Sequence, residues 1–241
     1  MEQRESFQER EYHVPYHWNW TPGTEIGRVY WFYLRRIREL LLQTGSRVHA
    51  DIGCGDGRAT AFLKETYIGS ITGFDYSERA VQMARIIADA PGIEWQVWDV
   101  KTPPPVNGVF DSATLIEVVE HFPIADLPLV FQHVHALLKT GGSLVLCTPS
   151  VLDTCVPKKH YQHFTQQQLT SLLEVAGFRV TLVEGQDRHS AWFIQLYRLV
   201  DNRLWCIKPL AKWMNTVLYS RYVDRASLSE AYRFIIRAEA V

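Results

Sequence analysis

An apolar run at residues 116–122, "IEVVEHF", contains two carboxylates and an imidazole. If one helical turn follows the run, Glu117, Glu120 and His121 share a face, because residues three and four apart are neighbours on a helix. The turn must be short, since Pro123 disfavours helix at the residue before it. Carboxylate oxygens and an imidazole nitrogen on one face form part of a metal site of mixed oxygen and nitrogen character.

A pair of imidazoles lies downstream in "KKHYQHFTQQQL", residues 158–169. His160 and His163 precede a predicted helix that Thr165 would cap. The segment follows a predicted strand, so either histidine could reach the same edge of a sheet as the first run. Without a metal, His121 or His163 is a candidate general base. A bound divalent ion would instead lower the pKa of a hydroxyl group that it binds.

Strands and helices alternate along the part of the chain that must position these groups. Short buried runs predict strands, and apolar residues at helical spacing predict the helices between them. The strands are predicted at 47–52, 71–76, 93–100, 110–116, 143–149 and 179–185, and the helices at 58–65, 78–90, 124–139 and 166–176. Gly141 and Gly142 are expected to stop the third of these helices, and Gly177 the fourth. The alternation predicts a parallel sheet wrapped by helices.

The alternation begins after an N-terminal helix, predicted over 23–46 with Thr24 as cap and Gly45 as stop, and it breaks near residue 186. Beyond the break, 190–225 predict irregular helices rich in aromatic residues, and 230–240 predict a final strand. We therefore predict an α/β fold with a mostly parallel seven-stranded sheet, helices on both faces, an N-terminal helical cap and an insertion before the last strand. The predicted division is 1–44 for the cap, 45–185 for the core, 186–230 for the insertion and 231–241 for the last strand.

Length, charge and cysteine content narrow the class of protein. The 241 residues suit one α/β domain with additions, and a formal net charge of −1 gives no overall attraction to nucleic acid. The four cysteines form no C-x-x-C pair, which favours a reducing cytoplasm. The charged start of the chain is unlike a signal peptide, and no apolar run approaches the roughly 20 residues of a membrane-spanning helix. We expect a cytoplasmic enzyme.

The stretch "VHADIGCGDGRAT", residues 48–60, is a predicted strand that runs through a glycine-rich turn into a helix. Glycine at 53, 55 and 57, with Cys54 between the first two, lets the backbone turn tightly and approach a ligand. The helix start that follows offers free N–H groups. The spacing is G-x-G-x-G, and Arg58 stands where a dinucleotide-binding fold has Gly or Ala.

Three acids end the first three predicted strands. Asp75 lies 20 residues past Gly55, the spacing at which a carboxylate can take both hydroxyls of a ribose. Asp99 could accept a hydrogen bond from an adenine amino group, with Trp98 and Val100 flanking the ring. Asp51 is expected to face a cationic amino acid tail.

Together these features resemble class I S-adenosylmethionine-dependent methyltransferases over roughly residues 45–185 and the final strand. The resemblance implies a Rossmann-like sheet, S-adenosyl-L-methionine as cofactor, and Glu117 at the start of the catalytic edge with His121 and His163 as candidate bases. The cofactor contacts that it implies are Asp51, Gly53, Cys54, Gly55, Gly57, Asp75, Tyr76, Asp99, Val100 and Ile116.

The E-x-x-E-H run resembles two groups within this class. One comprises metal-dependent methyltransferases that modify the 2′-hydroxyl at the 3′ end of small RNAs, in which a histidine five positions before a helix-opening threonine is the fourth ligand. That resemblance implies a divalent metal site of Glu117, Glu120, His121 and His160. The chain departs from that group at 162–164, Gln-His-Phe in place of Phe-Glu-Trp, and at Lys159 in place of Asp. A similar run occurs in ubiquinone-biosynthesis O-methyltransferases and other small-molecule and sugar methyltransferases.

Two segments outside the predicted methyltransferase core could select the molecule that accepts the methyl group. The aromatic stretch 12–20, "YHVPYHWNW", suits a flat ring or a sugar, or it packs on the sheet. Residues 191–223 carry five cations against Asp201, a local charge of 5 − 1 = +4. This basic, aromatic segment could contact the inner face of a membrane or a lipid-linked acceptor, grip a phosphate or an RNA end, or form a lid or homodimer contact.

The leading expectation is O-methylation of a small molecule, glycan or lipid-linked precursor. The alternatives are a metal-dependent RNA 2′-O-methyltransferase, which a charge near neutral makes less favoured, and a catalytically silent partner subunit that binds the cofactor.

Overall fold

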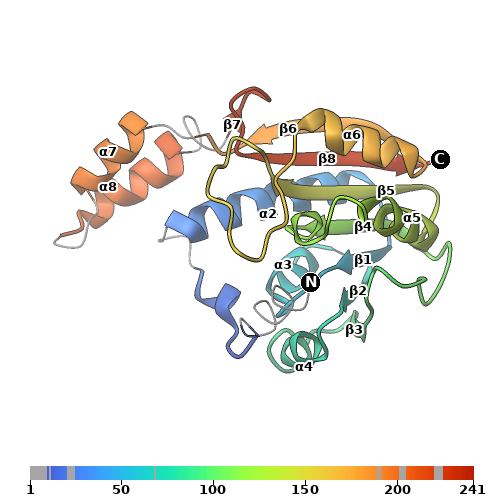
Figure 1. Ribbon diagram of the computed structural model, residues 1–241. Helices are drawn as coiled ribbons and strands as arrows, with labels where there is room; N and C mark the ends of the chain where they lie inside the picture. The colour runs from blue at the N-terminus through green and yellow to red at the C-terminus, as the bar shows by residue number, and fades with distance from the viewer. Residues whose placement is uncertain are drawn as a thin grey trace.

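A single eight-stranded sheet forms the centre of the computed structural model, which describes residues 10, 12–20, 25–67, 69–188, 191–200, 205–219 and 225–241 (Figure 1). The strands lie in the order β3-β2-β1-β4-β5-β8-β6-β7. Their bounds are β1 Val48–Ile52, β2 Ser70–Asp75, β3 Ile93–Val97, β4 Phe110–Ile116, β5 Leu138–Pro149, β6 Phe178–Gln186, β7 Arg225–Ala226 and β8 Arg233–Ala240.

The expected α/β Rossmann-like fold is confirmed, but the expected seven-stranded sheet is not. The five strands from β3 to β5 pair in parallel, whereas β8 runs antiparallel to both β5 and β6. The two-residue strand β7 adds an eighth, antiparallel member at the edge beside β6. So short a pairing carries no alternation of apolar residues, which is why the sequence did not indicate it.

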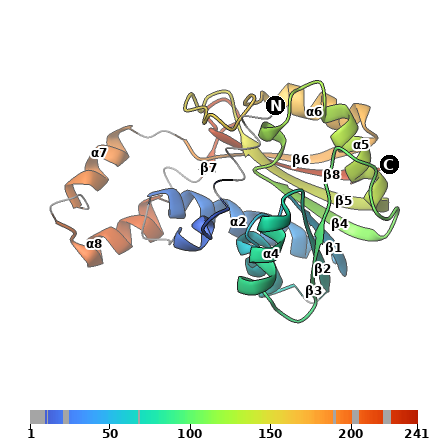
Figure 2. The same ribbon diagram turned by 60° about the horizontal axis from the view of Figure 1, so that its bottom comes forward.

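Helices cover both faces of the sheet (Figure 2). On one face lie α2 Glu25–Gln43, α3 Arg58–Lys64 and α4 Glu78–Ile87; on the other lie α5 Leu127–Leu137 and α6 Gln166–Val175. Leu34 and Ile37 of α2 share a buried cluster with Val145 and Ile235 of the sheet. The N-terminal helix is thus packed on the central strands.

The structure tests the predicted helix ends. Thr165 caps α6 in a reciprocal capping box with Gln168, and Gly177, at φ 90°, follows the helix as expected. Gly45, at φ 66°, likewise follows α2, whereas Thr24, the expected cap of α2, lies outside the described residues. Helix α5 ends at Leu137, earlier than predicted.

The early end of α5 follows from strand pairing. Leu138 already pairs with Phe110 of β4, and the register between the two strands shifts before Ser112 meets Ser143. The glycines at 141 and 142 lie inside this irregular part of β5, where they do not stop a helix. Strand β3 likewise ends at Val97, three residues before its predicted end, so Asp99 lies in the loop that follows.

The predicted irregular helices project from one end of the sheet, beyond β7, in both views (Figures 1 and 2). They are α7 Ala191–Val200 and α8 Lys208–Trp213, and α8 continues into the π-helix η3 Met214–Leu218. Short 3₁₀ turns are η1 Tyr16–Asn19 and η2 Val119–His121. Among the residues that the structure describes, no helix combines the length and apolar character needed to span a membrane.

A chain of buried polar groups joins β1 to β4 beneath the loops. His49 lies between Ser112 and Thr114, with its Nδ1 2.8 Å from one hydroxyl and its Nε2 3.0 Å from the other. Thr114 in turn donates to Asp51 at 2.7 Å. Burial lowers the pKa of His49 from 6.5 to about 3, so the ring is neutral in the folded protein.

We predict that His49 makes folding less favourable in acid. Its pKa is lower in the folded protein than in the unfolded chain, so the unfolded chain binds an extra proton below pH 6.5. Stability is therefore lost progressively as the pH falls from 6.5 toward 3, by about 2 kcal/mol at pH 5. Urea unfolding of wild type and His49→Asn at pH 7.5 and pH 5 measures this difference, which should shrink in the variant. His13→Asn, at an exposed position, is the control, and an undiminished pH dependence in His49→Asn would contradict the assignment.

Candidate active site

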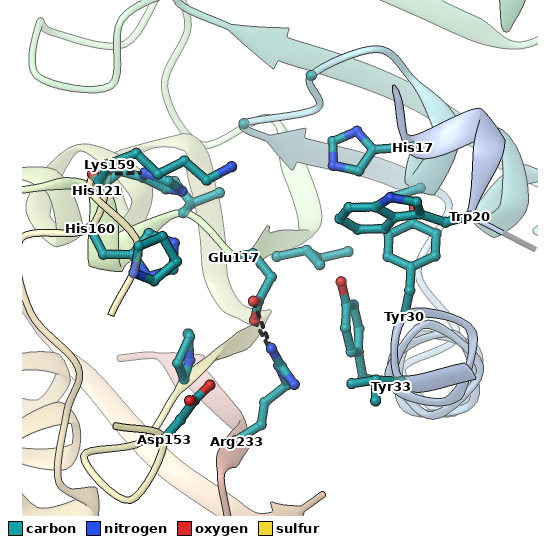
Figure 3. A pocket seen from close by; sticks show the side chains of 18 of the residues that line it. His17, Trp20, Tyr30, Tyr33, Glu117, His121, Asp153, Lys159, His160 and Arg233 are labelled. Carbon is teal, nitrogen blue, oxygen red and sulfur yellow. Dashed lines mark hydrogen bonds and ion pairs between the residues drawn. The ribbon is translucent and has the colours of Figure 1, made fainter. Parts of the chain in front are cut away.

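One cavity of about 1290 Å³ lies at the ends of the parallel strands, and the predicted motifs meet there (Figure 3). Pockets for a single small-molecule ligand typically measure roughly 300–1,000 Å³, so this volume can hold a cofactor and an acceptor together. The expected cofactor residues that line it are Asp51, Gly53, Cys54, Gly55, Asp75, Tyr76, Asp99, Val100 and Ile116. Gly57 is not among the lining residues.

The glycine turn between β1 and α3 has no room for a Cβ atom at Gly53 or Gly57. Gly53 has φ 77°, and its backbone N–H donates to the Phe74 carbonyl at 2.7 Å. A Cβ at Gly53 would lie 2.4 Å from Val118 Cγ2, and one at Gly57 would lie 2.7 Å from the Trp95 ring. The turn therefore brings bare backbone against the cavity, as the sequence predicted.

Asp75 ends β2 in contact with this turn. One carboxylate oxygen accepts a hydrogen bond from the Gly55 N–H at 2.9 Å, and the other accepts one from the Ser77 N–H at 2.9 Å. The side chain is buried but lines the cavity. A carboxylate oxygen can accept more than one hydrogen bond, so Asp75 can accept from ribose hydroxyls while it holds the turn.

Asp99 and its neighbours form a slot after β3. The Asp99 carboxylate accepts from the Lys101 N–H at 2.9 Å, and the Trp98 indole donates to the Pro103 carbonyl at 3.2 Å. Trp98 and Val100 are buried and line the cavity beside Asp99. A flat, partly apolar base with an amino group fits between such walls.

Asp51 is the most enclosed of the three acids. Its two oxygens accept hydrogen bonds from the Thr60 and Thr114 hydroxyls, at 2.5 and 2.7 Å. Burial raises the pKa of Asp51, and the two hydroxyls counteract this rise. A cationic amino group bound nearby would further favour the ionised carboxylate. The three acids and the bare turn thus fit S-adenosylmethionine.

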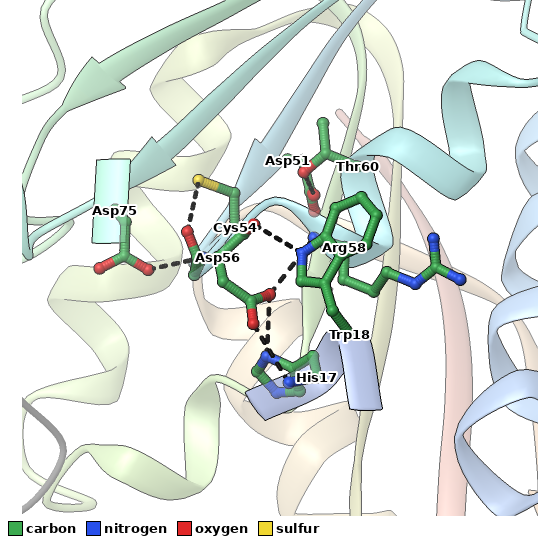
Figure 4. A network of polar contacts seen from close by, with 9 residues as sticks. His17, Trp18, Asp51, Cys54, Asp56, Arg58, Thr60 and Asp75 are labelled. Carbon is green, nitrogen blue, oxygen red and sulfur yellow. Dashed lines mark hydrogen bonds and ion pairs between the residues drawn. The ribbon is translucent and has the colours of Figure 1, made fainter. Parts of the chain in front are cut away.

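The 3₁₀ turn η1 is fastened over the glycine turn through Asp56, a contact that the sequence analysis missed (Figure 4). The His17 ring and backbone N–H contact the Asp56 carboxylate at 3.0 and 3.2 Å, and the Trp18 indole donates to the Asp56 carbonyl at 3.2 Å. The Arg58 guanidinium stacks on Trp18, with its Cζ 4.5 Å from the ring centroid. The sequence did contain a signal for this contact: an acid lies inside the glycine turn, and aromatic residues and histidines gather in the stretch 12–20.

Glu117 leaves the helical face on which it was expected. Its backbone is left-handed, at φ 56°, and the helical turn η2 begins only at Val119. The carboxylate instead forms a bidentate ion pair with Arg233 of β8, at 2.9 Å for both contacts. Its backbone N–H donates to the Cys147 carbonyl at 2.8 Å.

The structure brings together the other three expected metal ligands. Among the described residues, Glu120, His121 and His160 offer ligand atoms within 4.8 Å of one another, and Glu117 is not part of this group. Glu120 is fully buried, and one oxygen accepts from the Thr148 hydroxyl at 3.0 Å while the other has no partner. Burial raises the pKa of Glu120 well above its ordinary value.

Backbone carbonyls determine which ring nitrogens of the histidines carry protons. His163 Nδ1 is 2.7 Å from the Asp153 carbonyl, which can only accept, so this nitrogen carries the hydrogen. In neutral His163, Nε2 then accepts from His160 Nδ1 at 3.0 Å, and His160 Nε2 keeps a lone pair. His160 lines the cavity, whereas His163 does not, so His163 contacts the cavity through His160.

His121 has a similar arrangement. Its Nδ1 is 3.4 Å from the Lys159 carbonyl, which leaves Nε2 with a lone pair. Burial lowers the pKa of His121 to about 3 and that of His160 to about 4, so both rings are neutral near pH 7. Both residues line the cavity on the same side of Glu117 (Figure 3).

Comparison with known proteins decides the family. A methyltransferase-domain family model matches residues 28–183, more than half of the chain. The chain belongs to this methyltransferase family. The match covers the glycine turn, the three strand-end acids and both histidine segments.

Curated relatives resemble this methyltransferase at low identity. A wheat (Triticum aestivum) phosphoethanolamine N-methyltransferase 1 is 28% identical over 160 residues, which cover 62% of this chain and 32% of that protein. A probable S-adenosylmethionine-dependent methyltransferase of Mycolicibacterium smegmatis is 25% identical, with coverage of 76% and 77%. A ubiquinone biosynthesis O-methyltransferase of Xanthomonas euvesicatoria is 29% identical, with coverage of 63% and 70%. This chain thus spans about a third of the wheat enzyme's length.

Solved structures share the fold. The cyclase SpnF superposes with a TM-score of 0.58 at 19% identity, over 85% of this chain and 80% of that one. Magnesium protoporphyrin IX methyltransferase from Synechocystis PCC 6803, solved with bound S-adenosylmethionine, gives 0.58 at 16% identity over 90% and 82%. With the family match, the chain is a class I S-adenosylmethionine-dependent methyltransferase.

We predict that Asp75→Ala abolishes cofactor binding, with a loss of at least roughly 100-fold, because it removes a charged acceptor inside the cavity. Isothermal titration with S-adenosylmethionine measures the affinity, and the circular dichroism spectrum should stay unchanged. Asp99→Ala should lose roughly 10-fold, since it removes one contact to the base. Asp89→Ala, an exposed acid outside the cavity, is the control. Wild-type affinity in Asp75→Ala would show that the ribose acid is misassigned.

We predict strong energetic coupling between Glu117 and Arg233. Arg233→Met leaves a carboxylate without its cation in a partly buried site and should destabilise the fold by about 3 kcal/mol. In a double-mutant cycle with Glu117→Gln, urea unfolding should give a coupling above about 1 kcal/mol. The exposed pair between Arg179 and Glu239 is the matched control and should give less. Equal coupling in both pairs would contradict a structural role for the inner pair.

Proposed function

We propose that this methyltransferase modifies a hydroxyl oxygen of a small molecule, glycan or lipid-linked acceptor, and that His160 takes the proton. The observation that carries the proposal is the series of contacts from His160 through His163 to the Asp153 carbonyl. This series holds an unprotonated Nε2 of His160 at the cavity. A hydroxyl is a poor nucleophile until its proton leaves, so a fixed acceptor beside it supports oxygen as the target.

S-adenosylmethionine supplies an electrophilic methyl group on a sulfonium. The residues of this chain have to align the acceptor with that group, since an in-line displacement depends mainly on position. Ile116 ends β4, Glu117 follows it, and both line the cavity, so we expect the reacting oxygen to lie beside them. The Glu117 carboxylate raises the pKa of His160, so it favours the imidazolium that proton transfer creates.

The wall opposite the histidines supports a ring-bearing acceptor. Tyr16 and Trp20 come from the N-terminal segment, and Tyr30 and Tyr33 come from α2. In Figure 3, Trp20, Tyr30 and Tyr33 lie across the cavity from His121 and His160, with Glu117 between the two groups. Aromatic faces stack on flat rings, and their polar tips can bond ring substituents.

A second candidate is metal-assisted activation of the same hydroxyl. It is favoured by the cluster of Glu120, His121 and His160, and by the partnerless oxygen of buried Glu120. Two imidazoles and one carboxylate suit Mn²⁺, Fe²⁺, Co²⁺ or Zn²⁺ better than Mg²⁺. Under this alternative, an acceptor with two neighbouring oxygens, such as a catechol or vicinal diol, is expected.

The test is methyl transfer to a panel of a catechol, a simple phenol and a primary amine, with labelled S-adenosylmethionine and mass spectrometry of the product. We expect the label on oxygen, and a loss of roughly 100-fold in kcat for His160→Asn without a change in cofactor affinity. His13→Asn, an exposed histidine outside the cavity, is the control. Label on the amine alone would overturn the oxygen assignment.

Metal content separates the two candidates. Elemental analysis of protein purified without chelator, followed by the catechol assay with and without EDTA, measures the contribution of an ion. Full activity in EDTA supports His160 as the base. Loss of activity in EDTA with recovery on addition of Mn²⁺ or Co²⁺ supports the metal, and a good substrate with one isolated hydroxyl then counts against the two-oxygen acceptor.

A further inference from the structure

The helices α7 and α8, with η3, form a projecting hairpin that has two apolar faces. On the inner face of α7, Phe193 and Tyr197 are buried against Met214 and Tyr219. Large apolar side chains on the outer face of the hairpin are exposed, including Leu199 at 66% and Trp192 at 54%. A surface helix of a globular protein normally has one apolar stripe, which packs on the core. The second, exposed apolar face therefore indicates that the hairpin contacts another molecule.

The outer apolar stripe continues from one helix to the other. In α7 its members are spaced at i, i+4 and i+7, and in α8 and η3 they are spaced at i, i+3 and i+7, as expected for one face of each helix. Two more exposed apolar residues directly precede α8. The members are Trp192, Leu196, Leu199, Trp205, Ile207, Leu210, Trp213 and Val217.

The segment that carries this stripe is basic. Residues 191–219 contain four cations and one acid, a charge of 4 − 1 = +3, in a chain whose formal net charge is −1. The cations are Arg198, Arg203, Lys208 and Lys212, and the acid is Asp201. Apolar and indole side chains together with cations are characteristic of helices that lie in the interface of an anionic membrane.

We propose that the α7–α8 hairpin docks on an anionic phospholipid bilayer and that the acceptor is a membrane-resident amphiphile. The substrate part of this proposal rests on the proposed function. Charge complementarity favours a bilayer over a second copy of the chain. A two-fold dimer through this face would bring the same +3 segment against itself, whereas phosphatidylglycerol or phosphatidylserine headgroups would neutralise it.

The inner face of the same hairpin forms part of the cavity wall. Phe193, Tyr197 and Tyr219 line the cavity, and Arg28 of α2 donates to the Tyr197 hydroxyl at 2.7 Å. The Arg28 guanidinium also lies 4.3 and 5.3 Å from the centroids of the Tyr197 and Tyr219 rings. Docking through the outer face would therefore place the bilayer surface beside the cavity. An acceptor with a hydroxylated head and an apolar tail could reach the histidines while its tail stays in lipid.

Vesicle co-sedimentation tests the docking without any acceptor. Wild-type protein should bind vesicles that contain phosphatidylglycerol and bind pure phosphatidylcholine vesicles much less. Trp192→Ser/Trp213→Ser should lower the partition coefficient at least roughly tenfold, and Lys208→Glu should reduce binding to the anionic vesicles alone. The control is Ile86→Ser/Val175→Ser, which removes two even more exposed apolar side chains from α4 and α6 and should bind like wild type.

The substrate class has a separate readout. Wild type should methylate an alkyl-chain catechol in anionic vesicles, and Trp192→Ser/Trp213→Ser should lose roughly tenfold there while it keeps its rate on a soluble catechol. Equal loss on both catechols would contradict a role in acceptor delivery.

Three outcomes would overturn the docking: no vesicle binding by wild type, unchanged binding by the double tryptophan variant, or a dimer in sedimentation velocity that this variant abolishes. Vesicle binding without transfer to any hydroxyl would instead refute the proposed function and leave the docking in place.

Discussion

The ion pair between Glu117 and Arg233 fastens the end of β4 to the start of β8, and the shape of the active site depends on it. Glu117 has a left-handed backbone, a conformation that costs about 1 kcal/mol or more for a residue other than glycine. Two hydrogen-bonded contacts to the guanidinium and one backbone bond to β5 hold it there. The short turn η2 follows Glu117, and the ring of His121 at its end meets the ring of His160 edge to face, with centroids 4.8 Å apart. Arg233 is itself placed by Tyr33, whose ring centroid lies 5.0 Å from the Arg233 Cζ.

The two halves of the cavity meet at this ion pair and differ in chemistry. The half that we propose for the cofactor is made of backbone amides and of acids at or just after the ends of β1, β2 and β3, since parallel strands present their carboxyl ends at one edge. The half that we propose for the acceptor is made of aromatic rings and neutral histidines. The N-terminal segment serves both halves, because Asp56 fastens His17 over the glycine turn while Tyr16 and Trp20 face the acceptor side.

Buried titratable groups concentrate at the acceptor half. Burial keeps His121 and His160 neutral and raises the pKa of Glu120, and each group is costly to bury without a full set of partners. Backbone carbonyls of the loop after β5 orient His121 and His163, so the loop fixes which nitrogens can accept a proton or a ligand. Buried titratable groups with shifted pKa values are more typical of functional sites than of structural cores.

Local sequence was sufficient to predict the core of the sheet and the half of the cavity that we propose for the cofactor. The glycine turn, Asp75 and Asp99 could be placed from the chain alone, because strand periodicity is local and parallel strands bring their ends to one edge. The ends of α6 followed from Thr165 and Gly177 for the same reason. The boundary between helix α5 and strand β5 lies earlier in the chain than predicted. Leu138 pairs with Phe110 of β4, so the strand begins before the glycines that were expected to end the helix.

The acceptor half was decided by tertiary structure. Nothing in the residue type of Glu117 indicates a left-handed backbone, and its partner Arg233 is 116 residues away. The contact of Asp56 with His17 likewise joins segments far apart in the chain, and the contact of His163 with Asp153 joins two ends of the loop after β5. The sequence by itself determined which groups reach this edge of the sheet. Only the folded chain decided which of them pair, because ion pairs and hydrogen bonds depend on the positions of atoms that the chain brings together from distant segments.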